Sequence, residues 1–319
     1  MRKIKVLSLF SGIGAFEKAL VNCNIPFELV GYSEISKPAS LAYSKIHSVS
    51  EDLNLGDVCN IDETKLPEFD MMTWGFPCTN FSSARRDKDG KRQGLLSSES
   101  GLYYEGLRIL KECKPMISII ENVPDLLSDK FKDQFESILN DLSDCGYVSH
   151  YKVLNGADYN IPQSRKRLFI VSFRKDIYKG FDFPEKVELT KKVSDYLEDS
   201  ELIDDKFKKV NPNIVDKVLN RKLRDYNICP TITKAIGRAG SSSEYISNLS
   251  LVYRNTGVLR RMTPKETMLL DGFSEEDYLN AKSVSSDSRI YDFSGNSICV
   301  PVLEHIFKRI FIDFKYCSE

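Results

Sequence analysis

The sequence predicts an α/β protein built on a doubly wound, mostly parallel sheet with a smaller second domain. Two observations carry this prediction. Short apolar runs alternate with amphipathic helical stretches over residues 4–175, and the first apolar run, residues 4–10, passes through Gly12 and Gly14 directly into a helix. Strand, glycine turn and helix form the opening unit of such a sheet, whose ligands bind at the carboxyl ends of the strands.

Length and composition are those of a soluble globular protein. The 319 residues are 41% hydrophobic and 29% charged, enough for one large core and a smaller domain. The start at Met1 leads into a strand pattern and no apolar run reaches spanning length, so we expect a cytoplasmic protein without a membrane partner. Eight scattered Cys without a CxxC pair and three dispersed His predict free thiols and no metal.

The glycine turn favours a cofactor without phosphates. A dinucleotide fingerprint would place a third glycine at position 17, where this chain carries Glu17. A carboxylate at a helix start would repel a pyrophosphate, so S-adenosylmethionine is the candidate. The alternative is a tight turn with a purely structural purpose.

Two acids follow at predicted strand ends. Glu34 stands about twenty residues beyond the glycines, the spacing of a carboxylate that binds ribose hydroxyls. The alternative for Glu34 is a charge at the start of a helix before Lys37. Asp57, expected near the end of a third strand, can accept from an adenine amino group.

The apolar strand at residues 71–74 leads to a candidate nucleophile. Pro77 fixes the backbone immediately before Cys78, so the thiol is held in one place. The alternative is a packed free cysteine, which is what most are. The cationic segment 83–101 can be a lid over a phosphate backbone or a solvated charge run.

Further along, an acid and two arginines point to the same crevice. Glu121 follows the apolar strand at residues 116–120, so it is expected to face Cys78. Arg165 and Arg167 alternate, so in an extended chain they share a face.

The stretch from residue 206 to 256 differs in charge from the rest of the chain. It carries ten Lys/Arg against three Asp/Glu, a balance of +7 in a protein of net charge −1. Such a stretch suits nucleic-acid phosphates, with a solvated insertion as the alternative. We therefore predict a catalytic domain at 1–180, a recognition domain at 181–257 and a return to the catalytic domain at 258–319, which includes a helix over residues 300–312.

The motifs FSGIG, SEI, GDV, PCTNFS, ENV, QSRKR and SGNS follow one another between Val6 and Ile306. In this order they resemble the DNA (cytosine-5) methyltransferase family, in its small prokaryotic or phage form. The resemblance implies a class I S-adenosylmethionine-dependent methyltransferase domain with a small, irregular target-recognition domain. It implies methyl transfer to carbon 5 of a cytosine flipped out of double-stranded DNA, by a monomer paired with a restriction endonuclease.

The resemblance also assigns roles to residues. Cys78 would be the nucleophile, Glu121 the acid facing the base, Arg165 the contact to the base and Arg167 its support. The cofactor site would comprise Phe10, Gly12, Ile13, Gly14, Glu34, Ile35, Asp57, Val58, Pro77, Leu102, Asn296 and Ser297. The nucleic-acid contacts would be Ser82, Arg85, Arg86, Gln163, Arg167, Thr231, Lys234 and Arg238. Phe76, Thr79 and Asn80 depart from the family's usual residues.

The chemistry explains these residue types. A thiolate that adds to carbon 6 makes carbon 5 nucleophilic, and the charge that develops on the ring needs a proton donor at nitrogen 3. Glu121 must then be protonated, so we expect it to be partly buried with a raised pKa. Two alternatives stay open: a methyltransferase acting on tRNA cytosine, and a catalytically silent DNA-binding module. The recognised base sequence cannot be derived from these residues.

Overall fold

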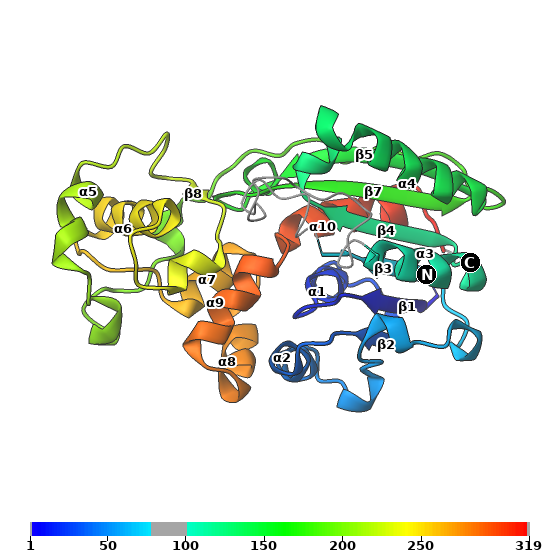
Figure 1. Ribbon diagram of the computed structural model, residues 1–319, viewed down its shortest axis with the longest axis horizontal. Helices are drawn as coiled ribbons and strands as arrows, with labels where there is room; N and C mark the ends of the chain where they lie inside the picture. The colour runs from blue at the N-terminus through cyan, green and yellow to red at the C-terminus, as the bar shows by residue number, and fades with distance from the viewer. Residues whose placement is uncertain (1, 78–100, 318–319) are drawn as a thin grey trace.

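A six-stranded sheet forms the centre of the computed structural model, which describes residues 2–77 and 101–317. The strand order is β2-β1-β3-β4-β7-β5 (Figure 1). The strands are β1 (Ile4–Leu9), β2 (Phe27–Ser33), β3 (Met71–Trp74), β4 (Ile117–Asn122), β5 (Tyr147–Asn155) and β7 (Lys166–Arg174). The helices that connect them are α1 (Ala15–Asn22), α2 (Lys37–His47), α3 (Leu102–Cys113) and α4 (Lys132–Asp144).

The direction of each strand decides which residues meet at the edge of the sheet where the carboxyl ends of β1 to β4 lie. This edge is called the functional edge below. Strands β1 to β4 run parallel to one another, so their carboxyl ends lie on one edge of the sheet. β7 runs antiparallel to β4 and pairs Leu168 with Asn122. The beginning of β7 therefore lies beside the end of β4, which brings Arg167 next to Glu121.

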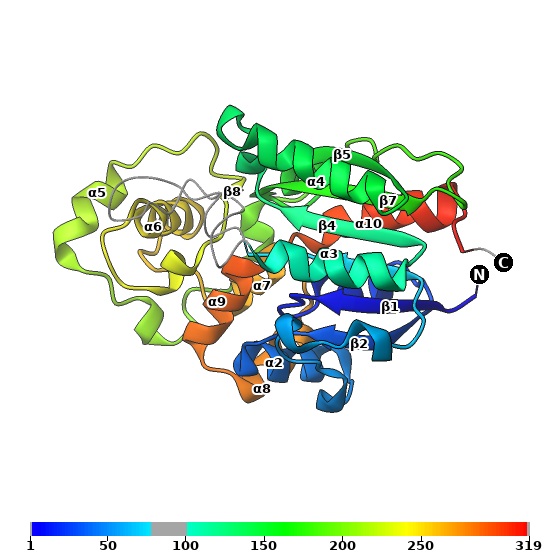
Figure 2. The ribbon, with the colours of Figure 1, turned by 45° about the vertical axis from the view of Figure 1, so that its right-hand side comes forward.

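Helices cover both faces of the sheet (Figure 2). α3 and α4 bury Ile109 and Ile138 in one core, while α1 and the C-terminal α10 (Val300–Phe307) bury Leu20 and Leu303 in the other. The alternation of side chains along a strand supplies both layers. In β1, for example, Val6 joins one core and Leu7 the other.

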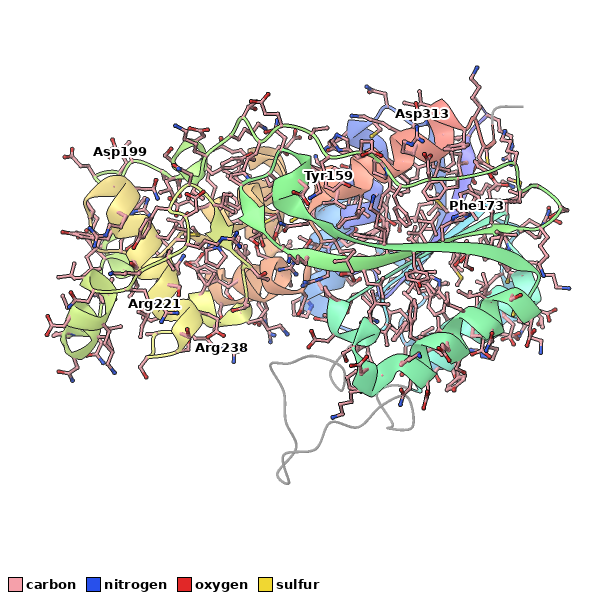
Figure 3. All side chains as sticks on the ribbon, turned by 90° about the horizontal axis from the view of Figure 1, so that it is seen from above. Tyr159, Phe173, Asp199, Arg221, Arg238 and Asp313 are labelled. Carbon is pink, nitrogen blue, oxygen red and sulfur yellow. The ribbon has the colours of Figure 1, made fainter. Side chains whose placement is uncertain are left out.

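A smaller, irregular lobe extends from one end of the sheet lobe (Figure 1). Its elements are the two-residue strand β8 (Cys229–Pro230), which pairs with β6 (Gln163–Ser164), and α5 (Val215–Leu219), α6 (Ser243–Thr256), α7 (Pro264–Leu270), α8 (Glu275–Val284) and α9 (Asp287–Asn296). Figure 3 shows Arg221 and Arg238 along one side of this lobe.

The core of the small lobe draws on both sides of residue 257. Ile232 and Leu251 pack there with Met262 and Tyr291. The helices that follow residue 257 contribute to the small lobe before α10 returns to the sheet. The predicted boundary at residue 257 stays a prediction.

Most predicted elements form, with two corrections. The predicted strand near Asp57 is absent from the described chain, because Asp57 instead caps a short 3-10 turn, Val58–Asn60. The C-terminal helix predicted over residues 300–312 ends at Phe307 and continues as a π-helical turn, Lys308–Asp313. Within the described ranges, we find no helix with the length and apolar character that a membrane span requires.

Candidate active site

The turn after β1 is built from residues with positive φ. Phe10, Gly12 and Gly14 have φ of 54°, 56° and 81°, a region that glycine enters without strain. A Cβ built on Gly14 would lie 2.1 Å from His47 Nε2, so a side chain does not fit there. A Cβ built on Gly12 would meet no described atom within 4 Å. The turn is therefore packed against His47 at Gly14 and open at Gly12.

Glu34 lies directly against this turn. Its Oε2 accepts a hydrogen bond from the Gly12 backbone N–H at 2.9 Å, and its Oε1 accepts one from the Ser36 N–H at 2.7 Å. Burial raises the pKa of the carboxyl, although both N–H groups oppose the shift. The neighbouring Ile35 is 75% exposed, so an apolar side chain stands free beside the carboxylate.

Asn54, which the sequence analysis did not single out, joins two segments of the predicted cofactor site. Its Oδ1 accepts from the backbone N–H groups of Glu34 and Gly56, at 3.1 and 3.0 Å. Its Nδ2 donates to the Glu34 carbonyl at 3.0 Å. One side chain thus ties the Glu34 segment to the loop that carries Asp57 and the buried Val58. The only signal in the sequence is an asparagine in a turn-like stretch, which is common.

The opposite part of the predicted cofactor site comes from three other segments. Pro77 and Leu102, the latter at the start of α3, are both half-buried. Asn296 is exposed at the end of α9, and Ser297, which follows it, is buried.

Glu121 and Arg167 form an ion pair at the functional edge of the sheet. Arg167 Nε lies 2.8 Å from Glu121 Oε1, and the two side chains are 18% and 14% exposed. Burial raises the pKa of Glu121 above the ordinary value of a glutamate, although the charges of Arg167 and Arg165 oppose the shift. This is the direction that the chemistry requires of a proton donor.

Glu121 also lies against the segment that leads to Cys78. A Cβ built on Gly75 would be 3.2 Å from Glu121 Oε2. Cys78 follows Gly75 by three residues and lies outside the described residues, as do Ser82, Arg85 and Arg86. Phe76, unusual for the family, is buried between Trp74 and Tyr103, with ring centroids 6.0 and 5.3 Å away.

The geometry gives the two arginines different contacts. Arg165 is 1% exposed and donates to the backbone carbonyls of Ile232 and Gly295, at 2.8 and 2.9 Å, and also to that of Ser297. These bonds hold Arg165 against backbone carbonyls of the small lobe and of the segment after α9, while its Nε has no hydrogen-bond partner among the described residues. The predicted contact from Arg165 to a base stays a prediction. Arg167, and not Arg165, is the arginine that faces Glu121.

Gln163 is likewise a structural residue. It is fully buried, donates to Leu270 O and Asp271 Oδ1, both at 2.9 Å, and accepts from the Ile232 N–H. Its hydrogen bonds all lie within the chain, and the predicted contact from Gln163 to nucleic acid stays a prediction. Its amide instead joins the strand before Arg167 to the small lobe.

The remaining predicted nucleic-acid contacts lie in the small lobe. Thr231 is half-exposed and donates from Oγ1 to the Ser164 carbonyl at 2.7 Å. Lys234 and Arg238 are exposed at the two ends of a short 3-10 turn. Among the described residues, no group of three His, Cys, Asp or Glu side chains is placed to hold a metal ion.

Comparison with known proteins identifies the family to which a chain with this fold and this site belongs. The model of the C-5 cytosine-specific DNA methylase family matches residues 4–312, and the chain belongs to that family. It is therefore a DNA cytosine-5 methyltransferase with the class I methyltransferase fold.

Two curated relatives resemble the chain over nearly their whole length. The type II methyltransferase M.Bsp6I of Bacillus sp. (strain RFL6) is 32% identical, over 97% of this chain and 98% of the relative. The orphan methyltransferase M.SPRI of Bacillus phage SPR is 30% identical, with the same coverage.

Solved structures share the fold. The Schizosaccharomyces pombe structure, titled Dnmt2 methyltransferase, superposes with a TM-score of 0.76 at 24% identity, over 98% of this chain and 100% of that one. A prophage-encoded protein of Escherichia coli, titled a putative DNA modification methyltransferase, gives 0.72 at 18% identity, over 97% and 99%.

Proposed function

We propose that this enzyme transfers the methyl group of S-adenosylmethionine to carbon 5 of a cytosine extruded from duplex DNA, through a covalent bond to Cys78. The observation that carries the proposal is the Glu121–Arg167 pair, which lies beside Gly75 just before the nucleophile. Family membership supports the reaction, and the geometry of this edge supports the assignment of residues.

In the first step, the Cys78 thiolate adds to carbon 6 of the cytosine and the electron pair moves toward carbon 5 and nitrogen 3. Glu121 in its protonated form donates a hydrogen bond at nitrogen 3, and burial, which raises its pKa, favours that form. Arg167 Nε occupies one carboxyl oxygen, and its guanidinium has further N–H groups for the carbonyl oxygen of the base.

In the second step, carbon 5 would take the methyl group from S-adenosylmethionine held beside Glu34 and Gly12, and S-adenosylhomocysteine would be the product that leaves. The carbon 5 proton is then lost to a base and the electron pair re-forms the ring double bond as Cys78 leaves. The thiolate is thereby regenerated and the ring is aromatic again.

The described residues fit a cofactor of this kind. S-adenosylmethionine, when bound, supplies an electrophilic methyl group. Glu34 would hold the ribose, Ile35 and Val58 the adenine faces and Asp57 its amino group, while the open space over Gly12 leaves room for the methionine portion. Phe10, Ile13, Pro77, Leu102, Asn296 and Ser297 would complete the site.

Duplex DNA would lie against both lobes. An intact duplex hides carbon 6 of cytosine from a protein thiol, so the base must be extruded. Lys234 and Arg238, exposed in a region of balance +7, would bind phosphates. We further propose a cytoplasmic monomer with domains at 1–180, 181–257 and 258–319, whose partner endonuclease acts on the same DNA sequence.

The test is a covalent trap. Duplex DNA carrying 5-fluorocytosine cannot lose its carbon 5 substituent as a proton, so the thiol adduct persists after methyl transfer. We expect the wild-type enzyme with S-adenosylmethionine to form a denaturant-resistant adduct, Cys78→Ala to form none, and Cys145→Ala, at the end of α4, to behave as wild type. An adduct with Cys78→Ala would refute the nucleophile, and methylation of tRNA in place of DNA would refute the substrate.

A further inference from the structure

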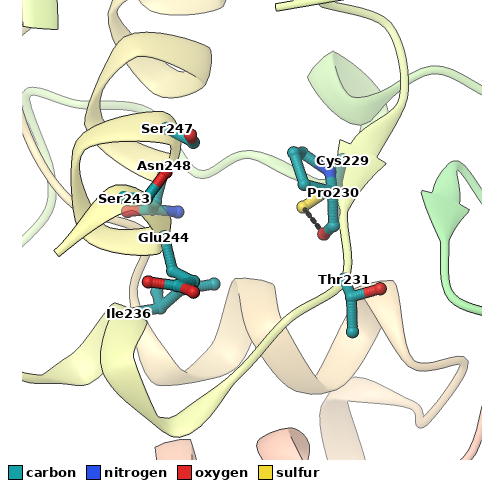
Figure 4. Close-up of a pocket in the computed structure, with 8 residues that line it drawn as sticks. All are labelled: Cys229, Pro230, Thr231, Ile236, Ser243, Glu244, Ser247 and Asn248. Carbon is teal, nitrogen blue, oxygen red and sulfur yellow. Dashed lines mark hydrogen bonds between the residues drawn. The ribbon is translucent and has the colours of Figure 1, made fainter. Parts of the chain in front are cut away.

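A cavity of about 180 Å³ opens in the small lobe between the start of α6 and β8 (Figure 4). The cavity is large enough for ordered water or for the edge of a ligand that carries hydrogen-bonding groups. It is lined by Cys229, Pro230, Thr231, Ile236, Ser243, Glu244, Ser247 and Asn248. Its wall β8 pairs with β6, which directly precedes Arg165 and Arg167.

Asn248 supplies a buried donor at this cavity. The residue is 3% exposed, and its Oδ1 accepts from the Met262 N–H at 3.1 Å. Its Nδ2 has no hydrogen-bond partner among the described residues. In Figure 4 this nitrogen points into the space between α6 and β8. A buried donor without a partner is destabilising, so the site suits a ligand with an acceptor atom.

Glu244 supplies an acceptor at the mouth of the same cavity. It is exposed and lies four residues before Asn248, on the same face of α6. Between residues 206 and 256 it is one of only three acids among ten cations. A carboxylate repels phosphates but accepts from the amino group of a base. Glu244 therefore suits base recognition, while the surrounding cations suit the backbone of DNA.

We propose that this cavity is a base-reading site that accepts a base with an exocyclic amino group, adenine or cytosine, and rejects guanine and thymine. The proposal rests on the proposed function, since it takes duplex DNA as the substrate. In the major groove only adenine and cytosine present an amino donor, whereas guanine and thymine present acceptors to which a carboxylate cannot bond.

Asn248 distinguishes the two accepted bases. Adenine places its acceptor N7 beside the amino group, where Asn248 Nδ2 can donate while Glu244 accepts. Cytosine in a base pair presents no such acceptor in the major groove. Glu244 and Asn248 can therefore each form a hydrogen bond with adenine, whereas with cytosine only Glu244 can.

The experiment determines the recognised sequence of each variant. Wild-type enzyme and Glu244→Gln methylate a hairpin-linked duplex library with randomised positions. Bisulfite sequencing of both linked strands then shows which flanking bases accompany each methylated cytosine, because guanine on the complementary strand identifies a flanking cytosine. We expect wild type to require adenine or cytosine at one position. Glutamine can also donate, so Glu244→Gln should accept guanine or thymine there, with discrimination reduced about tenfold. Glu201→Gln, exposed elsewhere in the lobe, should keep the wild-type pattern.

Asn248→Asp provides the second measurement, because it keeps the acceptor for Met262 and removes the donor. A change at the same position identifies adenine, and no change there beside an altered Glu244→Gln pattern identifies cytosine. The proposal is overturned if Glu244→Gln methylates the wild-type sequence with unchanged preference, or if the altered position requires guanine or thymine in wild type. Absence of any DNA methylation by wild type would instead refute the proposed function.

Discussion

Arg165 and Arg167 lie two residues apart and make entirely different contacts. Arg165 is enclosed by carbonyl groups from the small lobe and from the segment after α9. Arg167 is partly exposed and bonded to Glu121. A guanidinium presents five donors in a rigid fork, so the same side chain can either join buried carbonyls or hold a carboxylate beside a substrate.

Substitution should separate these two roles. We expect Arg167→Ala to fold normally and to lose about 10²–10³ in the rate of methyl transfer, since it removes a donor at the developing charge. Arg165→Ala should lower the free energy of unfolding by about 3 kcal/mol or more, because it leaves buried carbonyls unpaired. Single-turnover methylation and thermal unfolding measure the two effects.

Arg174→Ala is the matched control for both, because Arg174 lies at the far end of β7 and pairs with the exposed Asp176. It should change neither quantity appreciably. If Arg167→Ala proved as active as Arg174→Ala, Arg167 would have no place in catalysis.

At the scale of elements, α3 packs unusually closely on the strand that leads to Cys78. Gly106 faces Trp74, and a Cβ built there would lie 2.3 Å from the indole ring. Trp74 is fully buried and donates from Nε1 to Ser118 Oγ at 2.9 Å, so its ring has no free direction in which to move. The glycine therefore sets the distance between helix and sheet.

Gly106→Ala should destabilise the protein although alanine is the better helix former. Helix propensity favours alanine by about 1 kcal/mol, but overpacking a core costs about 1–3 kcal/mol and here meets an immobile ring. We expect a net loss in the free energy of unfolding, measured by denaturant titration. Glu112→Ala, exposed on the same helix, should be nearly neutral. Equal stability of Gly106→Ala and wild type would contradict the close packing.

At the scale of the whole molecule, buried titratable groups make stability depend on pH. His47 lies beneath the glycine turn, 3.0 Å from the Ile13 carbonyl, and burial lowers its pKa from 6.5 to about 4. The folded protein thus binds this proton less tightly than the unfolded chain. The part of the folding stability that depends on a neutral His47 is fully present above pH 6.5, and it is lost as the pH falls toward 4.

His47→Gln isolates this contribution, because glutamine can still donate to Ile13 but does not titrate. The stability of wild type relative to the variant should fall by up to about 3 kcal/mol between pH 7 and pH 4. Denaturant unfolding at both pH values checks it. A constant difference would show that His47 titrates normally in the folded protein.

Local pattern was enough to predict most of the fold. The strand at Met71–Trp74 and the strand, glycine turn and helix that begin the chain follow from apolar periodicity and turn residues, which act over a few positions. The conformation around Asp57 was harder to predict. An aspartate can cap a 3-10 turn or follow a strand, and the neighbouring residues do not distinguish the two. The contacts with Asn54 and Ser33 show how that loop is held.

By itself, the sequence determined the chemistry of this enzyme, because the residue types that the reaction needs appear in order along the chain. Tertiary structure alone decided which arginine faces Glu121. Side-chain alternation would place Arg165 and Arg167 on one face only in a continuous strand, and here β6 ends at Ser164 and β7 begins at Lys166. Arg165 falls at the break and turns inward to carbonyls that come from residues far away in the sequence.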